Sequence, residues 1–293
     1  MKIKSNTLSY FLIQPYPFYM EGKKIWKVLI VIFFITLSFN YLLQPFDVNH
    51  REHRMNYFWI SVIHSTTPLI ILLFMSFIIR KFPKIVDAWN IKKEFQFIFI
   101  ILILIGIVQF LVRDIIYDNS QNWSGHYLFE EISNTLFAGF FIAAIIIPIN
   151  VNALQLKNQQ KANIISSAFA KVKEIEISST ISIETDVKSE KFIFDSNRFL
   201  YAKSEGNYIE IYFKNDDEII KLTKRLSLKS LENQLQDFKF IIKTHRSVLL
   251  NFSIIENVSG NAQGYKIKLK ECSDTLPVSR NYIKSFESQV TLI

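Results

Sequence analysis

The chain has little of what most enzymes use to hold nucleotides or metals. Its 293 residues include one cysteine, Cys272, which excludes an intramolecular disulfide and a multi-cysteine metal site. The seven glycines form no Gly-rich phosphate loop, which argues against an ATPase or a kinase. The five histidines lack zinc-protease spacing, and no serine lies in a nucleophile elbow. We therefore predict a protein that is not an enzyme and binds no cofactor, with Cys272 a packing or surface residue.

Long apolar runs are abundant in the first half of the chain and absent from the second. They are Val28–Leu43, Tyr57–Ile79, Phe95–Val112 and Ile132–Ile149. A helix needs roughly 17–25 apolar residues to cross a bilayer core. The first run reaches that length when it is extended back to Ile25, because the amine of Lys27 can reach the membrane interface. We predict four transmembrane helices.

Lysine and arginine are unevenly distributed between these runs. They accumulate in the N-terminal tail, the second loop and the segment after the fourth run, whereas acidic residues balance them in the first and third loops. Since short cytoplasmic loops are rich in Lys and Arg, we expect both termini in the cytoplasm. The four tryptophans lie near the ends of the runs, where such rings anchor helices at the interface: Trp26, Trp59, Trp89 and Trp123.

Polar residues interrupt or flank two of the runs, and such residues in membrane spans often have a function. His64, Thr66 and Thr67 interrupt the second run, and Glu130 and Glu131 precede the fourth. We expect His64 and the two threonines to serve helix packing and the two glutamates to lie at the membrane interface. A ligand pocket near the outer surface is the alternative.

Beyond Pro148 the composition becomes polar, with apolar residues at loosely helical spacing. We predict a linker helix that continues the fourth run to about Glu174. Fewer than three clean heptads are present, so a coiled coil is only weakly indicated.

From Thr180 onward the pattern changes to the two-residue alternation of β-strands. The predicted strands are Ile181–Thr185, Lys191–Phe194, Phe199–Ser204, Tyr208–Phe213, Glu218–Thr223, Phe240–Ile242, Ser253–Val258, Tyr265–Lys270 and Thr275–Val278. A helix at about Leu226–Gln236 has Ser227 as its candidate N-cap, and a closing helix begins near Arg280. We expect Tyr201, Leu231, Leu235, Phe240 and Leu249 in the core.

Three polar clusters follow predicted strands or lie in loops. They are Lys203–Tyr208, Lys243–Ser247 and Val278–Asn281. Arg and Asn make bidentate bonds to guanine and adenine edges, while Lys, Ser, Thr and His suit phosphate oxygens. One such cluster resembles an ordinary solvated turn, but three in one β-rich domain favour nucleic-acid binding.

The order and spacing of three segments resemble the LytTR family of bacterial DNA-binding domains over roughly 181–292. The segments are Phe199–Tyr208 with its Glu-Gly-Asn-Tyr turn, Leu226–Asn251 with the His-Arg-Ser…Asn signature, and Leu276–Arg280. The resemblance implies a small-sheet fold whose loops, rather than a recognition helix, enter successive major grooves.

Mapped onto this chain, the resemblance implies that Asn207, Arg246 and Arg280, with His245 beside them, touch DNA. Lys203, Lys243 and Lys284 supply phosphate attraction, which depends on salt. From Thr180 onward the chain holds 17 basic and 15 acidic residues, which indicates modest affinity of a single copy for DNA. A homodimer on paired half-sites is therefore favoured over a monomer.

The predicted fold is thus multi-domain: an α-helical transmembrane bundle of four spans followed by a mostly-β LytTR-like DNA-binding domain. The expected boundaries are a cytoplasmic tail at 1–24, transmembrane helices at 25–149, a linker at 150–179 and the DNA-binding domain at 180–293. The predicted function is a membrane-anchored one-component transcription regulator in the bacterial plasma (inner) membrane. Its expected partners are double-stranded DNA, membrane lipid and an unidentified signal at the membrane or outer loops. The alternatives are a membrane adaptor whose β domain binds a protein, and a small transporter with a regulatory tail.

Overall fold

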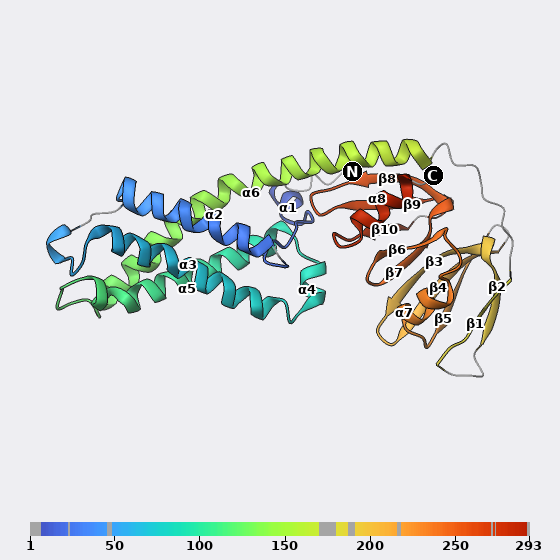
Figure 1. Cartoon of the computed structure of the whole chain (residues 1–293), viewed down its shortest axis with the longest axis horizontal. Coiled ribbons are helices and arrows are strands. Elements are labelled where there is room, and N and C mark those ends of the chain that lie inside the picture. The colour runs from blue at the N-terminus through green and yellow to red at the C-terminus, as the bar shows by residue number, and fades with distance from the viewer. Residues whose placement is uncertain are drawn as a thin grey trace. The chain divides into compact units, whose positions relative to one another are not determined.

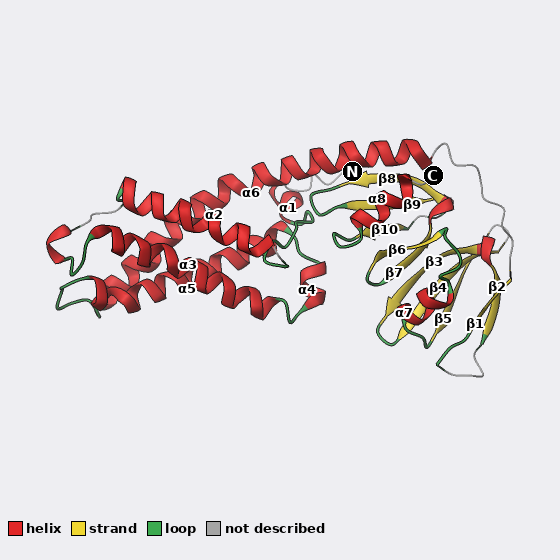
Figure 2. Ribbon diagram, viewed as in Figure 1, coloured by secondary structure: helices red, strands yellow, loops and turns green. Residues whose placement is uncertain are grey.

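The computed structural model describes residues 7–22, 24–45, 49–169, 180–186, 191–215, 218–270, 272 and 274–291. It divides into two compact units, 1–151 and 152–293. Helices make up the first unit, and strands dominate the second (Figures 1 and 2). This order agrees with the predicted fold class.

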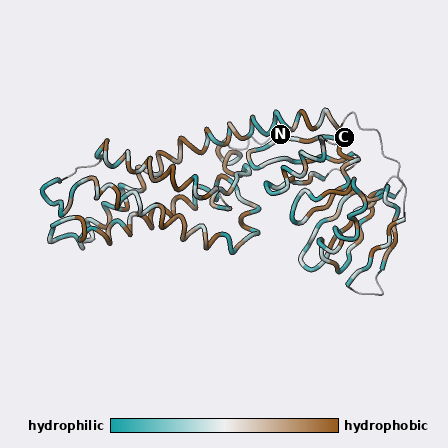
Figure 3. The backbone as a smooth tube through the Cα atoms, in the orientation of Figure 1, coloured by the Kyte–Doolittle hydropathy of each residue, from teal (hydrophilic) through white to brown (hydrophobic). Residues whose placement is uncertain are grey.

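Among the described residues, four helical segments are long and apolar enough to cross a membrane. They are Ile25–Leu43, formed by α2 (Lys24–Ser38) and a π-helical turn (Phe39–Leu43), then α3 (Tyr57–Ile79), α5 (Ile91–Ile116) and α6 (Gly125–Phe169). Figure 3 shows the hydrophobic colour running along these helices. Two short helices, α1 (Thr7–Leu12) and α4 (Pro83–Asp87), were not predicted.

The hydroxyl groups within α3 bond to their own helix. Ser65, Thr66 and Thr67 donate to the carbonyls of residues four positions earlier, at 2.6–3.1 Å. A hydroxyl that bonds within its helix needs no outside partner. The expectation that the threonines serve packing is therefore consistent with their geometry, and Pro68 lies within the same helix.

Two of the residues singled out near the ends of the runs have side-chain partners within the first unit. Arg113 of α5 donates to Glu131 at 2.5 Å, and the side chains of Arg113 and Glu131 are 8% and 12% exposed. Trp89 is buried at 3% exposure, and its indole N–H donates to Glu94 at 2.6 Å. Arg113 and Glu131 lie 18 positions apart on different helices, so the local pattern did not reveal their pairing, whereas Glu94 is five positions from Trp89.

Three antiparallel sheets form the second unit. The smallest pairs β1 (Thr180–Ile183) with β2 (Phe192–Asp195). The second has the order β10-β9-β8 and the third β5-β4-β3-β7-β6. Their strands are β3 (Phe199–Glu205), β4 (Tyr208–Asn215), β5 (Glu218–Lys224), β6 (Ile241–His245), β7 (Val248–Asn251), β8 (Ile255–Gly260), β9 (Tyr265–Leu269) and β10 (Thr275–Val278).

Two helices complete this unit, α7 (Leu228–Gln234) and α8 (Ile283–Thr291). The Ser227 hydroxyl accepts from the Ser230 amide at 3.0 Å, which confirms the predicted N-cap. Strand β7, however, was missed, although it lies between β3 and β6 and all four of its residues are buried.

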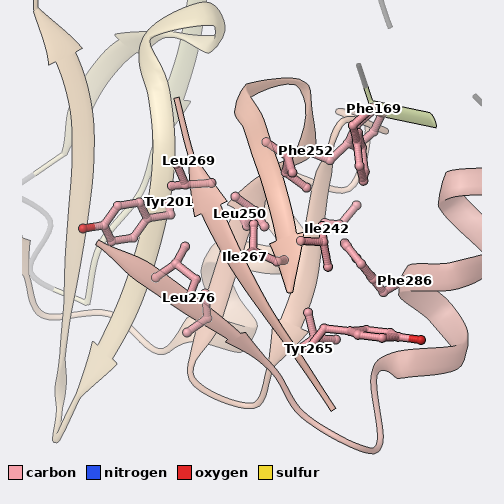
Figure 4. Packing of buried hydrophobic residues seen from close by; sticks show 14 of the residues in the cluster. Phe169, Tyr201, Ile242, Leu250, Phe252, Tyr265, Ile267, Leu269, Leu276 and Phe286 are labelled. Atoms are coloured by element: carbon pink, nitrogen blue, oxygen red, sulfur yellow. The ribbon is translucent and has the colours of Figure 1, made fainter. Parts of the chain in front are cut away.

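Two apolar clusters hold the second unit together. One lies beneath α7 and includes Leu231, Leu235 and Leu249, at 0–2% exposure. The other joins the two larger sheets and includes Tyr201, at 1% exposure (Figure 4), and Phe240, at 9%. All five residues predicted to be core are therefore buried.

The end of α6 belongs to this second cluster. Phe169 packs among Phe252 and Phe286, with ring centroids 6.3 and 6.2 Å away (Figure 4). At the edge strand β8, the Ser166 hydroxyl accepts from the Val258 amide at 2.9 Å, and the Gln159 carboxamide accepts from the Gly260 amide at 3.1 Å. Side chains of α6 thus accept hydrogen bonds from backbone amides of β8. In an edge strand without such a cover, these amides face solvent or pair with another strand.

Candidate nucleic-acid interface

The first predicted cluster lies at the hairpin turn between β3 and β4. Glu205 pairs with Tyr208, so Gly206 and Asn207 are the two turn residues. Gly206 has φ +60°, a conformation that favours glycine at the first position of a two-residue hairpin turn. The turn exposes Asn207, as its predicted role requires.

The second cluster lies at the turn between β6 and β7. Arg246 is exposed there, and His245 precedes it at the end of β6. The Ser247 amide donates to His245 Nδ1 at 3.2 Å, and the Ser247 hydroxyl lies 2.6 Å from the same atom. Since Nδ1 accepts a hydrogen bond from the Ser247 amide within the turn, His245 fixes the local backbone.

The third cluster follows β10. The Ser279 amide donates to the Thr244 carbonyl at 2.8 Å, which brings Arg280 next to the end of β6. Arg280 is partly exposed, and Lys284 is exposed in the following helix, α8.

Backbone hydrogen bonds bring the three clusters together. The Ser204 amide donates to the Ser247 carbonyl at 2.9 Å and so joins the first turn to the second. The bond from Ser279 to Thr244 joins the third cluster to the second. Asn207, Arg246 and Arg280 therefore lie at one end of the five-stranded sheet, although 73 positions separate the first from the last.

The same end carries two basic residues that the sequence reasoning missed. Lys224 pairs with Ile209 at the end of β5, beside the first turn, and Arg225 follows it. Arg225 is exposed, and its carbonyl accepts from the Asp186 amide at 3.1 Å. The signal available in the sequence was the Lys-Arg pair that ends a predicted strand.

Charge is therefore unequally distributed in a domain whose total is nearly neutral. The turn end holds Lys224, Arg225, Arg246, Arg280 and Lys284 against Glu205 and Asp186. The other end of β3 and β4 holds Arg198 and Lys214 with Asp195 and Glu218. A phosphate backbone is attracted by the local cluster of charge rather than by the sum over the domain.

Two predicted lysines have acidic partners within the domain. Lys243 forms an ion pair with Glu232 of α7, and its side chain is 18% exposed. Lys203 lies 3.1 Å from Asp274 and 5.0 Å from the Tyr201 ring centroid. These pairings reduce the positive charge that either lysine presents to a phosphate.

Asp274 is the centre of a small polar network. The Tyr201 hydroxyl donates to it at 2.6 Å, and Lys203 donates to the same oxygen. These two bonds hold the pKa of Asp274 below its usual range, while burial and the bond to Asp274 raise the pKa of Tyr201. The network ties β3 to the segment before β10 and so helps to position the third cluster.

Comparison with known proteins identifies this domain. Residues 189–291 match the family model described as the LytTr DNA-binding domain. Among solved structures, the chain is similar to the LytTr DNA-binding domain of a methyl-accepting/DNA response regulator from Bacillus cereus. That match has 16% identity and a TM-score of 0.31, and it covers 38% of this chain and 96% of the other. No curated protein matches the chain.

Proposed function

Because residues 189–291 are a LytTR DNA-binding domain, we propose that this chain is a membrane-anchored, one-component transcription regulator. The family match supports a DNA-binding regulator, and the four long apolar helices suggest a membrane protein. In this proposal the membrane is the bacterial plasma membrane, both termini are cytoplasmic, and two copies bind duplex DNA.

The proposed organisation keeps the boundaries expected from the sequence: a tail at 1–24, spans at 25–149, a linker at 150–179 and the DNA-binding domain at 180–293. The part of the linker beyond Phe169 lies outside the described residues. A signal at the outer loops or within the bundle would alter the packing of α6. Since α6 continues past Pro148 to Phe169, the same helix would carry that change to the DNA-binding domain.

The observation that carries the DNA-binding proposal is the convergence of Asn207, Arg246 and Arg280 at one sheet end. Arg246 and Arg280 are proposed to make bidentate contacts to base edges or phosphates. Asn207 would bond a base or a phosphate, and His245 would support the second turn. Arg225 and Lys284 would add phosphate attraction, with smaller contributions from Lys203 and Lys243, because their charges are paired.

The test uses the full chain in lipid nanodiscs and a duplex enriched from a randomised library. Arg246→Ala and Arg280→Ala should each weaken binding by about 1–3 kcal/mol and relax sequence preference, if each reads a base edge. Lys284→Ala should weaken binding to all duplexes alike. It should also reduce, by about 1, the slope of the logarithm of the binding constant against the logarithm of the salt concentration.

Arg198→Ala is the matched control, because Arg198 is an exposed arginine at the opposite end of β3. It should leave binding close to wild type. Equal losses in Arg198→Ala and the two turn variants would refute the assignment of the turns.

A membrane adaptor is the second candidate function. The edge strand β5 exposes Ile219 and Ile220 at 42% and 45%, and such an edge can pair with a protein strand. The nanodisc experiment separates the two, since an adaptor would retain no duplex from the library.

A further inference from the structure

The part of α6 in the second unit has two opposite faces. One face packs against the DNA-binding domain through Ala162, Ile165 and Phe169, at 0–7% exposure. The other consists of five residues spaced three or four apart, which is one side of a helix. All five are exposed, and we call them the α6 stripe: Ala153, Leu156, Gln160, Asn163 and Ser167.

The α6 stripe follows a heptad repeat. Leu156 and Asn163 occupy one heptad position, while Ala153, Gln160 and Ser167 occupy the other, as d and a positions do in a coiled coil. The same phase continues back along the sequence through three residues of the first unit. These are also exposed: Ile142, Ile146 and Ile149.

The chemistry of the α6 stripe fits a second copy of itself. None of its five residues is charged, and the two lysines of this segment, Lys157 and Lys161, lie beside it. Two copies can therefore approach without placing like charges face to face. The Gln160 carboxamide carries donors and an acceptor, so it can bond to its own counterpart. Asn163 Oδ1 accepts from Gln159 at 2.9 Å, and an amide oxygen has a second lone pair that can accept from the counterpart Asn163.

We propose that the α6 stripe is the contact surface between two copies of this chain, paired as parallel helices in register. The inference rests on the proposed function for the membrane, because two copies inserted the same way hold α6 parallel and at equal depth. The DNA-binding domain lies on the opposite face of α6 and so does not obstruct the pairing. Leu156 is the only large apolar residue of the stripe, so the contact is weak and depends on the membrane to concentrate the copies.

Disulfide crosslinking tests the pairing directly. Cys272 is buried, and Cys272→Ser gives a parent without other cysteines. Leu156→Cys and Asn163→Cys are introduced separately into the full-length parent, and membrane vesicles are oxidised. Lys161→Cys is the control, because Lys161 is exposed on the same helix but lies off the stripe. We expect a disulfide-linked dimer in both stripe variants at several-fold the control yield.

A second measurement separates real pairing from random collision. Leu156→Glu places like charges opposite each other in the parallel pair, so it should abolish the crosslink of Asn163→Cys. Equal yields at Lys161→Cys and the stripe, or no crosslink at the stripe, overturn the proposal. If the crosslinks fail while Arg246-dependent duplex binding persists in nanodiscs, the stripe is wrong and the proposed function stands. If duplex binding also fails, the proposed function falls as well.

Discussion

The contact between α6 and β8 can be tested by adding one methyl group. A Cβ built on Gly260 would lie 2.3 Å from Asn158 C, 2.4 Å from Gln159 N and 2.5 Å from Asn158 O. Carbon atoms in contact are normally about 3.5–4.0 Å apart, so Gly260→Ala must move the helix by about 1 Å or more. The atoms in the way are backbone, so no side-chain rotation relieves the clash.

The structure also gives the size of the effect. Displacing α6 breaks the bond from the Gly260 amide to Gln159 and the 2.6 Å bond from the Asn158 carboxamide to the Asn261 carbonyl. Each hydrogen bond contributes about 1 kcal/mol, and overpacking costs about 1–3 kcal/mol. We expect the free energy of unfolding of the second unit to fall by on the order of 3 kcal/mol.

Hydrogen exchange of the full chain in nanodiscs checks this prediction. Peptides with the Val258 and Gly260 amides should exchange faster in Gly260→Ala, because their acceptors lie on α6. Peptides from β4 should be unchanged. Ser259→Ala is the control, since Ser259 is an exposed neighbour on the same strand. If Gly260→Ala exchanges and unfolds like wild type, α6 does not pack on β8.

Three further predictions concern stability. Asp274→Asn should lower the free energy of unfolding by about 1 kcal/mol or less at neutral pH, because its pair with Lys203 is partly exposed. Since folding lowers the pKa of Asp274, its contribution is present above about pH 4 and disappears as the pH falls below it, so urea titrations of variant and wild type should converge in acid. Arg113→Met should lower the stability of the first unit by about 3–5 kcal/mol in detergent melting, because it leaves the Glu131 charge unpaired. The double variant Arg113→Met with Glu131→Gln should lose less, and equal losses in the two variants would contradict the ion pair. Ser227→Ala should remove about 1 kcal/mol through loss of the α7 N-cap, and Ser230→Ala, whose backbone amide still donates, serves as its control in the same urea assay.

The sequence predicted those features that depend on local periodicity. Uninterrupted apolar runs marked α2, α3, α5 and the first part of α6, because a bilayer requires length and the absence of charge. Alternating residues marked nearly all the strands, and Ser227 marked a helix start. Strand β7 was missed because its run of apolar residues, Val248–Leu250, does not alternate and is only three residues long before Asn251.

The residue types of the candidate site also came from the sequence, but their spatial arrangement did not. Composition showed Asn207, Arg246 and Arg280 in three separate polar turns, and only the pairing of β3 with β7 and the bond from Ser279 to Thr244 bring them together. Likewise, the ion pairs of Lys243 with Glu232 and of Arg113 with Glu131 join residues from different elements. Periodicity reports which side of an element is apolar, whereas the partner of a charge depends on how distant elements pack. For that reason the sequence alone determined the membrane-like helices and the β-rich domain, while tertiary structure decided which charges remain available to a ligand.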